Sequence, residues 1–177
     1  MNKKILITGL PRCGKSTLIT KLIKYYTHQK NYTIYGFLTP EVREVGNRIG
    51  FDIVDIFSGD TTQLARVGNY NTRHKVGKYN VFVENLDEFI NKNLDLSKKS
   101  LDLIIIDEIG KMELFSKNFQ NYIKKIFSLD LPIIATISLK LNHPLKNYLM
   151  NLAFVEVLTL NRHNSQIIFE KVTSIIT

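Results

Sequence analysis

The chain has only one cysteine, Cys13, so no disulfide can form within it. A lone cysteine fits a reducing compartment, and we expect the cytoplasm. Long apolar runs are also missing, since a stretch such as 101–106 is strand-sized and far short of the roughly 18 residues that cross a bilayer. The apolar stretch after Lys3 and Lys4 breaks at Thr8-Gly9, too early for a signal peptide. We therefore expect a protein that neither crosses a membrane nor is exported.

Low-complexity tracts and repeats at a solenoid period are absent from the 177 residues. A chain of that length supports one domain with a substantial core and is short for two. We therefore expect a single domain over residues 1–177, and a monomer. The histidines share no metal-ligand spacing, so the sequence predicts no zinc site. They are His28, His74, His143 and His163.

Acidic residues are in the minority, with 16 Asp and Glu against 24 Lys and Arg and a formal net charge of +8. This excess favours anionic ligands such as nucleotides, and also nucleic acid. The lysines are scattered rather than massed, which indicates a solvated surface. One basic stretch is compatible with nucleic acid, but a solvated loop is the better interpretation and we expect no such partner. Its residues are Arg66, Tyr70, Arg73, His74, Lys75, Lys78 and Tyr79.

Strand and helix patterns alternate along the chain and predict a three-layer α/β fold with a mostly parallel sheet and one inserted antiparallel hairpin. Apolar runs predict strands at 3–8, 101–107, 133–137 and 154–160. Helical spacing of apolar residues predicts helices at 17–26, 84–96, 119–127 and 165–176. Strand-like segments at 35–38 and 49–56 flank a Gly-Asn turn and form the hairpin. Residues 57–77 are rich in turn signals and are expected to be partly irregular, with a short strand at 79–83.

A glycine-bounded loop between the first predicted strand and helix matches the P-loop pattern. Its glycines let the backbone curl so that N–H groups point at phosphate oxygens, while the helix that follows directs its positive end at the same anion. Lys15 is expected to reach the β- and γ-phosphates, and the Ser16 hydroxyl to bind Mg²⁺. The predicted nucleotide-binding residues of this loop are Gly9, Leu10, Pro11, Arg12, Cys13, Gly14, Lys15, Ser16 and Thr17.

A second apolar strand ends in two acids at the carboxyl edge of the predicted sheet. Asp107 is expected to hold Mg²⁺ through water, and Glu108 to orient and deprotonate the attacking water. The nucleotide-binding prediction extends here over Leu103, Ile104, Ile105, Ile106, Asp107, Glu108, Ile109 and Gly110.

Two further features concern the γ-phosphate. Thr136 lies near the end of the next strand, where P-loop ATPases keep a polar residue that senses this phosphate. Charge that grows on the transferred phosphoryl group must be neutralised by a cation. Lys111, Arg43 and Arg48 are the candidates, and we predict Lys111 to be catalytic together with Lys15 and Glu108.

The segment at 107–115, Asp-Glu-Ile-Gly-Lys-Met-Glu-Leu-Phe, resembles the signature of the cancer-related nucleoside-triphosphatase family, first known from thermophiles. Segments 36–43, 48–51, 65–67 and 76–79 resemble its other motifs in the same order, and Asn161-Arg162 resembles a closing motif. The resemblance covers residues 5–137 and 159–164. It implies a RecA-like P-loop fold and slow hydrolysis of several nucleoside triphosphates (ATP, GTP, CTP and UTP) to diphosphate and phosphate. We predict Asn161 and Arg162 to lie on the base side.

Two features depart from the family pattern. The P-loop reads Leu-Pro-Arg-Cys where relatives often carry Pro-Pro-Gly-Val, and we assign Cys13 no catalytic role because a cysteine here is usually only a small residue. Residues 138–151 are less family-like, so the sequence assigns no base contact there.

Two alternative functions use the same P-loop. A kinase would pass the γ-phosphate to a nucleotide or nucleoside, but it needs an acceptor pocket and usually an arginine-bearing lid, and the sequence shows no tight arginine cluster. In a nucleotide-dependent adaptor or RNA-binding protein, hydrolysis would only set the lifetime of a conformational state. The Gly-Phe-Leu-Thr-Pro-Glu stretch at 36–41 also resembles P-loop adaptors of molybdenum-cofactor guanylation, which share less of the chain.

Overall fold

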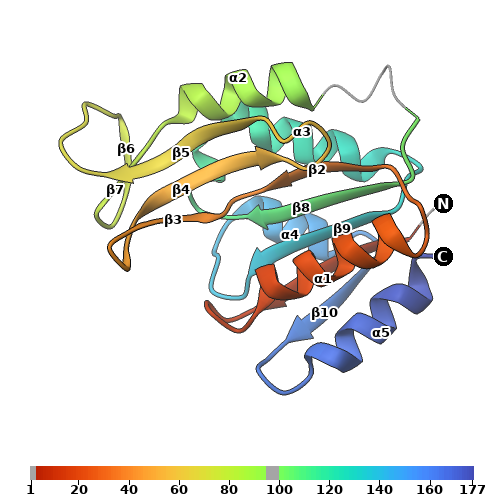
Figure 1. Cartoon of the computed structure of the whole chain (residues 1–177). Helices are drawn as coiled ribbons and strands as arrows, with labels where there is room; N and C mark the ends of the chain where they lie inside the picture. Colours follow the sequence, from red (N-terminus) through yellow and green to blue (C-terminus); the bar gives the residue numbers. More distant parts are fainter. Residues whose placement is uncertain (1–2, 95–99) are drawn as a thin grey trace.

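A five-stranded parallel sheet forms the centre of the computed structural model, which describes residues 3–94 and 100–177 (Figure 1). Its strands lie in the order β10-β1-β9-β8-β2, and each neighbouring pair is parallel. All five carboxyl ends therefore meet at one edge, as predicted for a P-loop fold. The bounds are β1 (Lys4–Gly9), β2 (Ile34–Leu38), β8 (Leu103–Ile109), β9 (Ile133–Ser138) and β10 (Val155–Leu160).

Beyond β2 the sheet continues as an antiparallel extension that is larger than the single predicted hairpin. β4 pairs with β2 and β3, then with β5, which is followed by β7 and β6. The irregular segment predicted at 57–77 in fact contains β5 and β6. The sequence hides β5 because only two of its seven residues are buried, so it lacks an apolar run. The bounds are β3 (Glu41–Glu44), β4 (Asn47–Asp55), β5 (Thr61–Val67), β6 (His74–Val76) and β7 (Tyr79–Val81).

Helices cover both faces of the sheet (Figure 1). One core lies under α1 and α5, where Ile105 of β8 packs with Leu18 and Val172. The other lies under α2, α3 and α4, where Ile106 packs with Phe119. Successive β8 residues face opposite cores because side chains alternate along a strand. The bounds are α1 (Lys15–His28), α2 (Val83–Asn93), α3 (Lys117–Ser128), α4 (Pro144–Met150) and α5 (Ser165–Ile175), with a 3₁₀ turn η1 (Glu113–Phe115) before α3.

The predicted three-layer α/β fold with a mostly parallel central sheet is confirmed. The helix predicted at 84–96 is α2, and residues 95 and 96 of that prediction lie outside the described residues. The short helix α4 was not predicted; it begins at Pro144, and the His143 side chain accepts the Leu145 N–H at its start. Within the described ranges, no helix has the length and apolar character needed to cross a bilayer.

Gly36 allows β2 to approach β8. Its φ is +121°, and a Cβ there would overlap the carbonyl oxygen of Ile105. An L side chain is disfavoured both by the backbone conformation and by a neighbour that belongs to the central strand. The strand that positions Asp107 thus depends on a glycine in its partner strand.

We predict that Gly36→Ala lowers the free energy of unfolding by about 3 kcal/mol or more, since backbone strain adds to overpacking. Gly59→Ala is the matched control, because Gly59 also has a positive φ, +77°, but a Cβ there would meet nothing within 4 Å. It should cost about 1 kcal/mol. Urea unfolding of both variants measures the difference, and equal losses would contradict the steric explanation.

Candidate active site

The P-loop curls between β1 and α1 through two residues with positive φ. Arg12 has a φ of +62° and Gly14 of +102°, and the Cys13 N–H donates to the Leu10 carbonyl at 3.2 Å. Gly14 is the N-cap of α1 and carries no side chain to cap it. The first N–H groups of α1 therefore face the loop interior, and together with the helix dipole they suit a bound anion.

Gly9 joins β1 to this loop at a crowded point. A Cβ at Gly9 would lie 2.5 Å from Cys13 Sγ and 2.7 Å from the Leu160 carbonyl oxygen. Only glycine fits here, and Cys13 packs against its backbone. The Cys13 thiol fills space next to β10.

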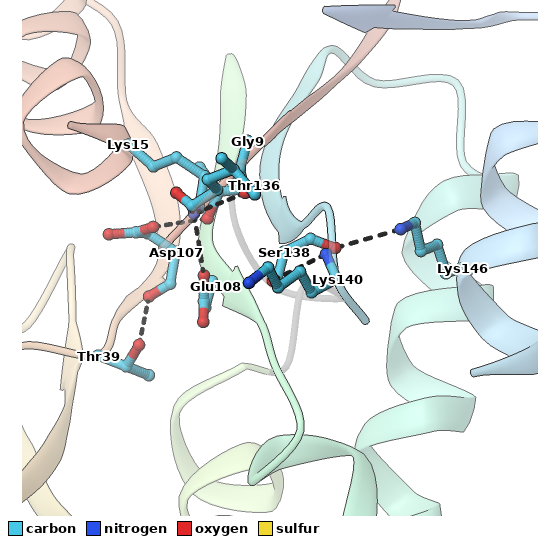
Figure 2. Close-up of polar contacts among 10 residues, drawn as sticks. Gly9, Lys15, Thr39, Asp107, Glu108, Thr136, Ser138, Lys140 and Lys146 are labelled. Carbon is cyan, nitrogen blue, oxygen red and sulfur yellow. Dashed lines mark hydrogen bonds and ion pairs between the residues drawn. The ribbon is translucent and has the colours of Figure 1, made fainter. Parts of the chain in front are cut away.

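Lys15 connects the P-loop with the acidic end of β8 (Figure 2). Its Nζ donates to the carbonyl oxygens of Gly9 and Leu10, both at 3.3 Å. The same Nζ lies 4.0 Å from Glu108 Oε2, and the side chain is only 8% exposed. The ammonium group is thus held beside Glu108 by the loop's own backbone.

Asp107 is held by residues of two neighbouring segments. Thr136 Oγ1 of β9 donates to Asp107 Oδ1 at 2.5 Å. Thr39 Oγ1, just beyond β2, donates to the Asp107 backbone oxygen at 2.9 Å. The β8–β9 register shifts between Ile106 and Ile109, so the regular ladder opens at the two acids. Asp107 is oriented from both sides while one carboxylate oxygen, Oδ2, takes no part in the Thr136 bond.

The apolar part of the predicted nucleotide site lies in the interior. Leu103, Ile104, Ile105 and Ile106 are 0% exposed and lie within the two cores. Helices cover both faces of β8, so these side chains are enclosed by the two cores. Ile109 is also fully buried. These buried residues fix the strand end that carries Asp107 and Glu108.

Glu108 is partly buried, with 36% of its side chain exposed. Burial raises the pKa of its carboxyl group above the ordinary value, the negative charge of Asp107 raises it further, and the Lys15 ammonium opposes the rise. A carboxylate with a raised pKa is a stronger base. The environment of Glu108 therefore suits proton abstraction.

Glu113 lies beside the predicted acids but was not among the predicted site residues. It lies in η1, its side chain is 3% exposed, and burial together with the charge of Glu108 raises its pKa to about 8. A Cβ at Gly110 would lie 2.6 Å from Glu113 Oε2 and 3.1 Å from Glu108 Oε1. Two carboxyl groups therefore converge on Gly110. In the sequence, the feature that could have pointed to Glu113 is a single acid within the apolar run Met-Glu-Leu-Phe, at 112–115.

The loop after β9 was also missed. Lys146 of α4 is buried, and its Nζ donates to the carbonyl oxygens of Ser138 at 3.2 Å and Leu139 at 2.6 Å (Figure 2). The Leu139 N–H donates in turn to the Gly9 carbonyl at 3.0 Å. Lys146 thus holds this loop against the P-loop. In the sequence it resembles any exposed helical lysine.

The remaining predicted residues lie around this centre. Ser16 and Thr17 are exposed at the start of α1. Asn161 and Arg162 follow β10, whose Leu160 is the register partner of Gly9, and Asn161 Oδ1 accepts the His163 N–H at 2.8 Å. These segments adjoin the P-loop.

The candidate cations differ in their surroundings. Lys111 is exposed directly after Gly110. Arg43 and Arg48 both pair with the carboxylate of Glu41, at 2.6 and 2.7 Å, in the β3–β4 hairpin. In this conformation the two arginines are occupied within the extension, whereas Lys111 is exposed.

Part of the basic stretch is packed against the protein. Arg66 pairs with Asp52, and the His74 ring stacks on Phe115 at 4.5 Å between centroids. Tyr79 is buried and accepts a hydrogen bond from Arg48 Nε at 2.8 Å. These residues were expected to lie in a solvated loop; instead they lie in β5, β6 and β7 and pack within the extension.

The fold and site together define a P-loop nucleotide-binding protein. A profile of the NTPase family matches residues 4–173, and the chain belongs to that family. Nucleoside-triphosphatase THEP1 of Thermotoga sp. (strain RQ2) is 39% identical over 173 residues, which are 98% of this chain and 95% of the relative. Nucleoside-triphosphatase THEP1 of Archaeoglobus fulgidus is 38% identical over 173 residues, 98% of each chain.

Two solved structures share the fold. The crystal structure of THEP1 from the hyperthermophile Aquifex aeolicus superposes with a TM-score of 0.82 at 31% identity, over 98% of each chain. The solution structure of a human cancer-related nucleoside triphosphatase gives a TM-score of 0.79 at 31% identity, over 97% of this chain and 96% of that one. The resemblance inferred from the motifs is confirmed.

The buried Glu113 carboxyl predicts a pH-dependent stability of the metal-free protein. Its pKa is about 8 in the folded chain and near 4.3 when unfolded. Between these values the folded state retains a proton that the unfolded state has lost, so stability decreases as pH rises, by up to about 1.4 kcal/mol per unit. Glu113→Gln removes this titration.

Urea unfolding in EDTA at pH 5.5, 6.5 and 7.5 measures the difference between native chain and variant. We expect Glu113→Gln to become progressively more stable than the native chain as pH rises. A difference that is constant with pH would show that Glu113 is ionised in the folded protein.

Proposed function

We propose that this chain is a nucleoside-triphosphatase that converts ATP, GTP, CTP and UTP to the nucleoside diphosphate and phosphate. Membership of the NTPase family over residues 4–173 supports hydrolysis, as do relatives named nucleoside-triphosphatases along 98% of this chain. The observation that carries the proposal is Glu108 Oε2, 4.0 Å from the P-loop lysine Lys15. A carboxylate at that position can activate water, which is the acceptor that separates a hydrolase from a kinase.

Residues 9–17 bind the triphosphate in this proposal, with backbone N–H groups and Lys15 facing the phosphates. Ser16 and Asp107 fit Mg²⁺, a hard cation that prefers hydroxyl and carboxylate oxygens and retains several waters. Thr136 occupies Asp107 Oδ1, which leaves Oδ2 for a water of the ion. When bound, Mg²⁺ neutralises charge on the β- and γ-phosphates.

In the chemical step, Glu108 acts as the general base. Its carboxylate takes a proton from water as the water oxygen attacks the γ-phosphorus, and the bond from that phosphorus to the β–γ bridging oxygen breaks. Lys15 stabilises the charge on the transferred phosphoryl group, and Lys111 is the second cation. Thr136 senses the γ-phosphate through its bond to Asp107.

Nucleotide base contacts are assigned to Asn161 and Arg162, in the loop beside Gly9. Because this loop is exposed, it places few steric limits on the base, which supports broad base tolerance. We further propose that the chain acts as one P-loop domain, as a monomer, in the cytoplasm, and without a nucleic-acid partner.

We predict that Lys15→Ala and Glu108→Gln each lower phosphate release from all four triphosphates by about 10²-fold or more. Glu108→Gln should still bind nucleotide, because it keeps the shape of the side chain and removes only the base. Malachite-green phosphate assays give the rates, and a fluorescent ATP analogue gives the binding constant.

Lys21→Ala and Glu170→Gln are the controls, since Lys21 and Glu170 are exposed and contact only Gln166 of α5 in these hydrogen bonds. Both should retain the native rate. If Glu108→Gln hydrolysed ATP at the native rate, Glu108 would not be the base. If the native chain bound nucleotide and transferred the γ-phosphoryl group only to an added nucleoside or nucleotide, the kinase alternative would replace the hydrolase.

Metal dependence is predicted from Asp107 and its hydrogen bond. EDTA should abolish phosphate release, and added Mg²⁺ should restore it. Thr136→Val removes the bond to Asp107 at nearly constant volume, so we expect a roughly tenfold loss of rate and a higher Mg²⁺ concentration at half activity. Titration of the rate with Mg²⁺ measures both, and an unchanged Mg²⁺ requirement would contradict this role of Thr136.

A further inference from the structure

The two oxygens of the Glu108 carboxyl group face different neighbours. Oε2 lies 4.0 Å from Lys15 Nζ, on the P-loop side. Oε1 lies 3.1 Å from the point that a Cβ of Gly110 would occupy, and Glu113 Oε2 lies 2.6 Å from the same point. The carboxyl group of Glu108 is therefore flanked by a cation on one side and by a second, buried carboxyl group on the other.

Glu113 is anchored more firmly than Glu108. It is buried within η1, and interactions with the backbone of Glu113 and of Gly110 partly oppose the rise of its pKa. The turn between Gly110 and Leu114 is closed by the Leu114 N–H, which donates to the Gly110 carbonyl at 3.1 Å. A carboxyl group held by its own turn can restrict the side-chain conformations of its partly exposed neighbour, Glu108.

We propose that Glu113 is a positioning residue for hydrolysis: its carboxyl group fixes the Oε1 side of Glu108 across Gly110, so that Oε2 stays turned toward Lys15 and the γ-phosphate. This inference rests on the proposed role of Glu108 as the base. Glu113 itself touches neither substrate nor the attacking water.

The chemical state of Glu113 is consistent with this role. Burial and the charge of Glu108 keep it protonated near neutral pH, and a neutral carboxyl group does not repel the Glu108 carboxylate. A neutral acid is also a hydrogen-bond donor, as the amide of glutamine is. A side chain of similar length without polar atoms would leave Oε1 of Glu108 without a polar neighbour on that side.

The test uses Glu113→Gln and Glu113→Met, which keep the length of the side chain and differ in polarity. We expect Glu113→Gln to retain kcat within about threefold. Glu113→Met should lose about 10- to 100-fold in kcat with nucleotide affinity unchanged and no decrease in melting temperature, because the loss acts through the orientation of the base. A purely structural role predicts instead that the melting temperature or the nucleotide affinity decreases together with kcat.

A double-mutant cycle shows whether the effect passes through Glu108. In a Glu108→Gln background the base is already missing, so adding Glu113→Met should change the residual rate less than twofold. An equal loss in both backgrounds would overturn the proposal, and so would an unchanged kcat for Glu113→Met in the native background.

A crystal structure of Glu113→Met gives a readout that does not depend on activity. We expect Glu108 Oε2 to move away from Lys15 Nζ, and an unmoved Glu108 overturns the proposal. Failure of the proposed function is recognised separately. A native chain that releases no phosphate refutes hydrolysis, and a fully active Glu108→Gln refutes the base. If only the positioning role of Glu113 fails, the native chain still releases phosphate and Glu108→Gln is still inactive.

Discussion

The carbonyl oxygen of Gly9 is the point at which the parts of the site are joined. It accepts hydrogen bonds from Lys15 Nζ at 3.3 Å and from the Leu139 N–H at 3.0 Å. Leu139 is itself held by Lys146, and the missing Cβ of Gly9 admits the Leu160 carbonyl. The ends of β10, β1 and β9 are thus fixed relative to the P-loop lysine without a ligand. Such preorganisation reduces the ordering that substrate binding and the transition state would otherwise require.

On the other side of Lys15 the constraint is electrostatic. Three carboxyl groups, those of Asp107, Glu108 and Glu113, lie within one strand end and the turn that follows it, and burial or mutual repulsion raises the pKa of the last two. Repulsion is limited because Glu113 is neutral near pH 7 and Lys15 lies beside Glu108. A bound divalent cation at Asp107 would reduce it further. The neutral state of Glu113 therefore lowers the repulsion on the carboxylate of Glu108, the proposed base.

The sequence predicts those features that depend on local pattern. The P-loop, the buried strands and the acids at the end of β8 follow from spacing and apolar runs, and the structure brings Lys15 and Glu108 together as that pattern requires. Contacts between distant segments were not predictable. Lys146 is buried only because α4 packs beside Ser138, and β5 is a strand only through its pairing with β4 and β7. Glu113 is a local exception: its environment comes from the turn at Gly110, and the sequence pattern did not predict that turn.

The antiparallel extension supports the site as well as enlarging the sheet. Thr39, at the junction of β2 and the extension, donates to the backbone of Asp107. At the far end of the extension the His74 ring stacks on Phe115, two residues beyond Glu113. The segment from Asp107 to Phe115 is therefore braced at both its ends by the extension, while β9 and α4 fix the P-loop side. Because the β8–β9 ladder is interrupted at the two acids, regular pairing with β9 is missing there, although Asp107 still pairs with Leu38 of β2. The hydrogen bond from Thr136 and the contacts from the extension hold the acids on the side where the ladder is open.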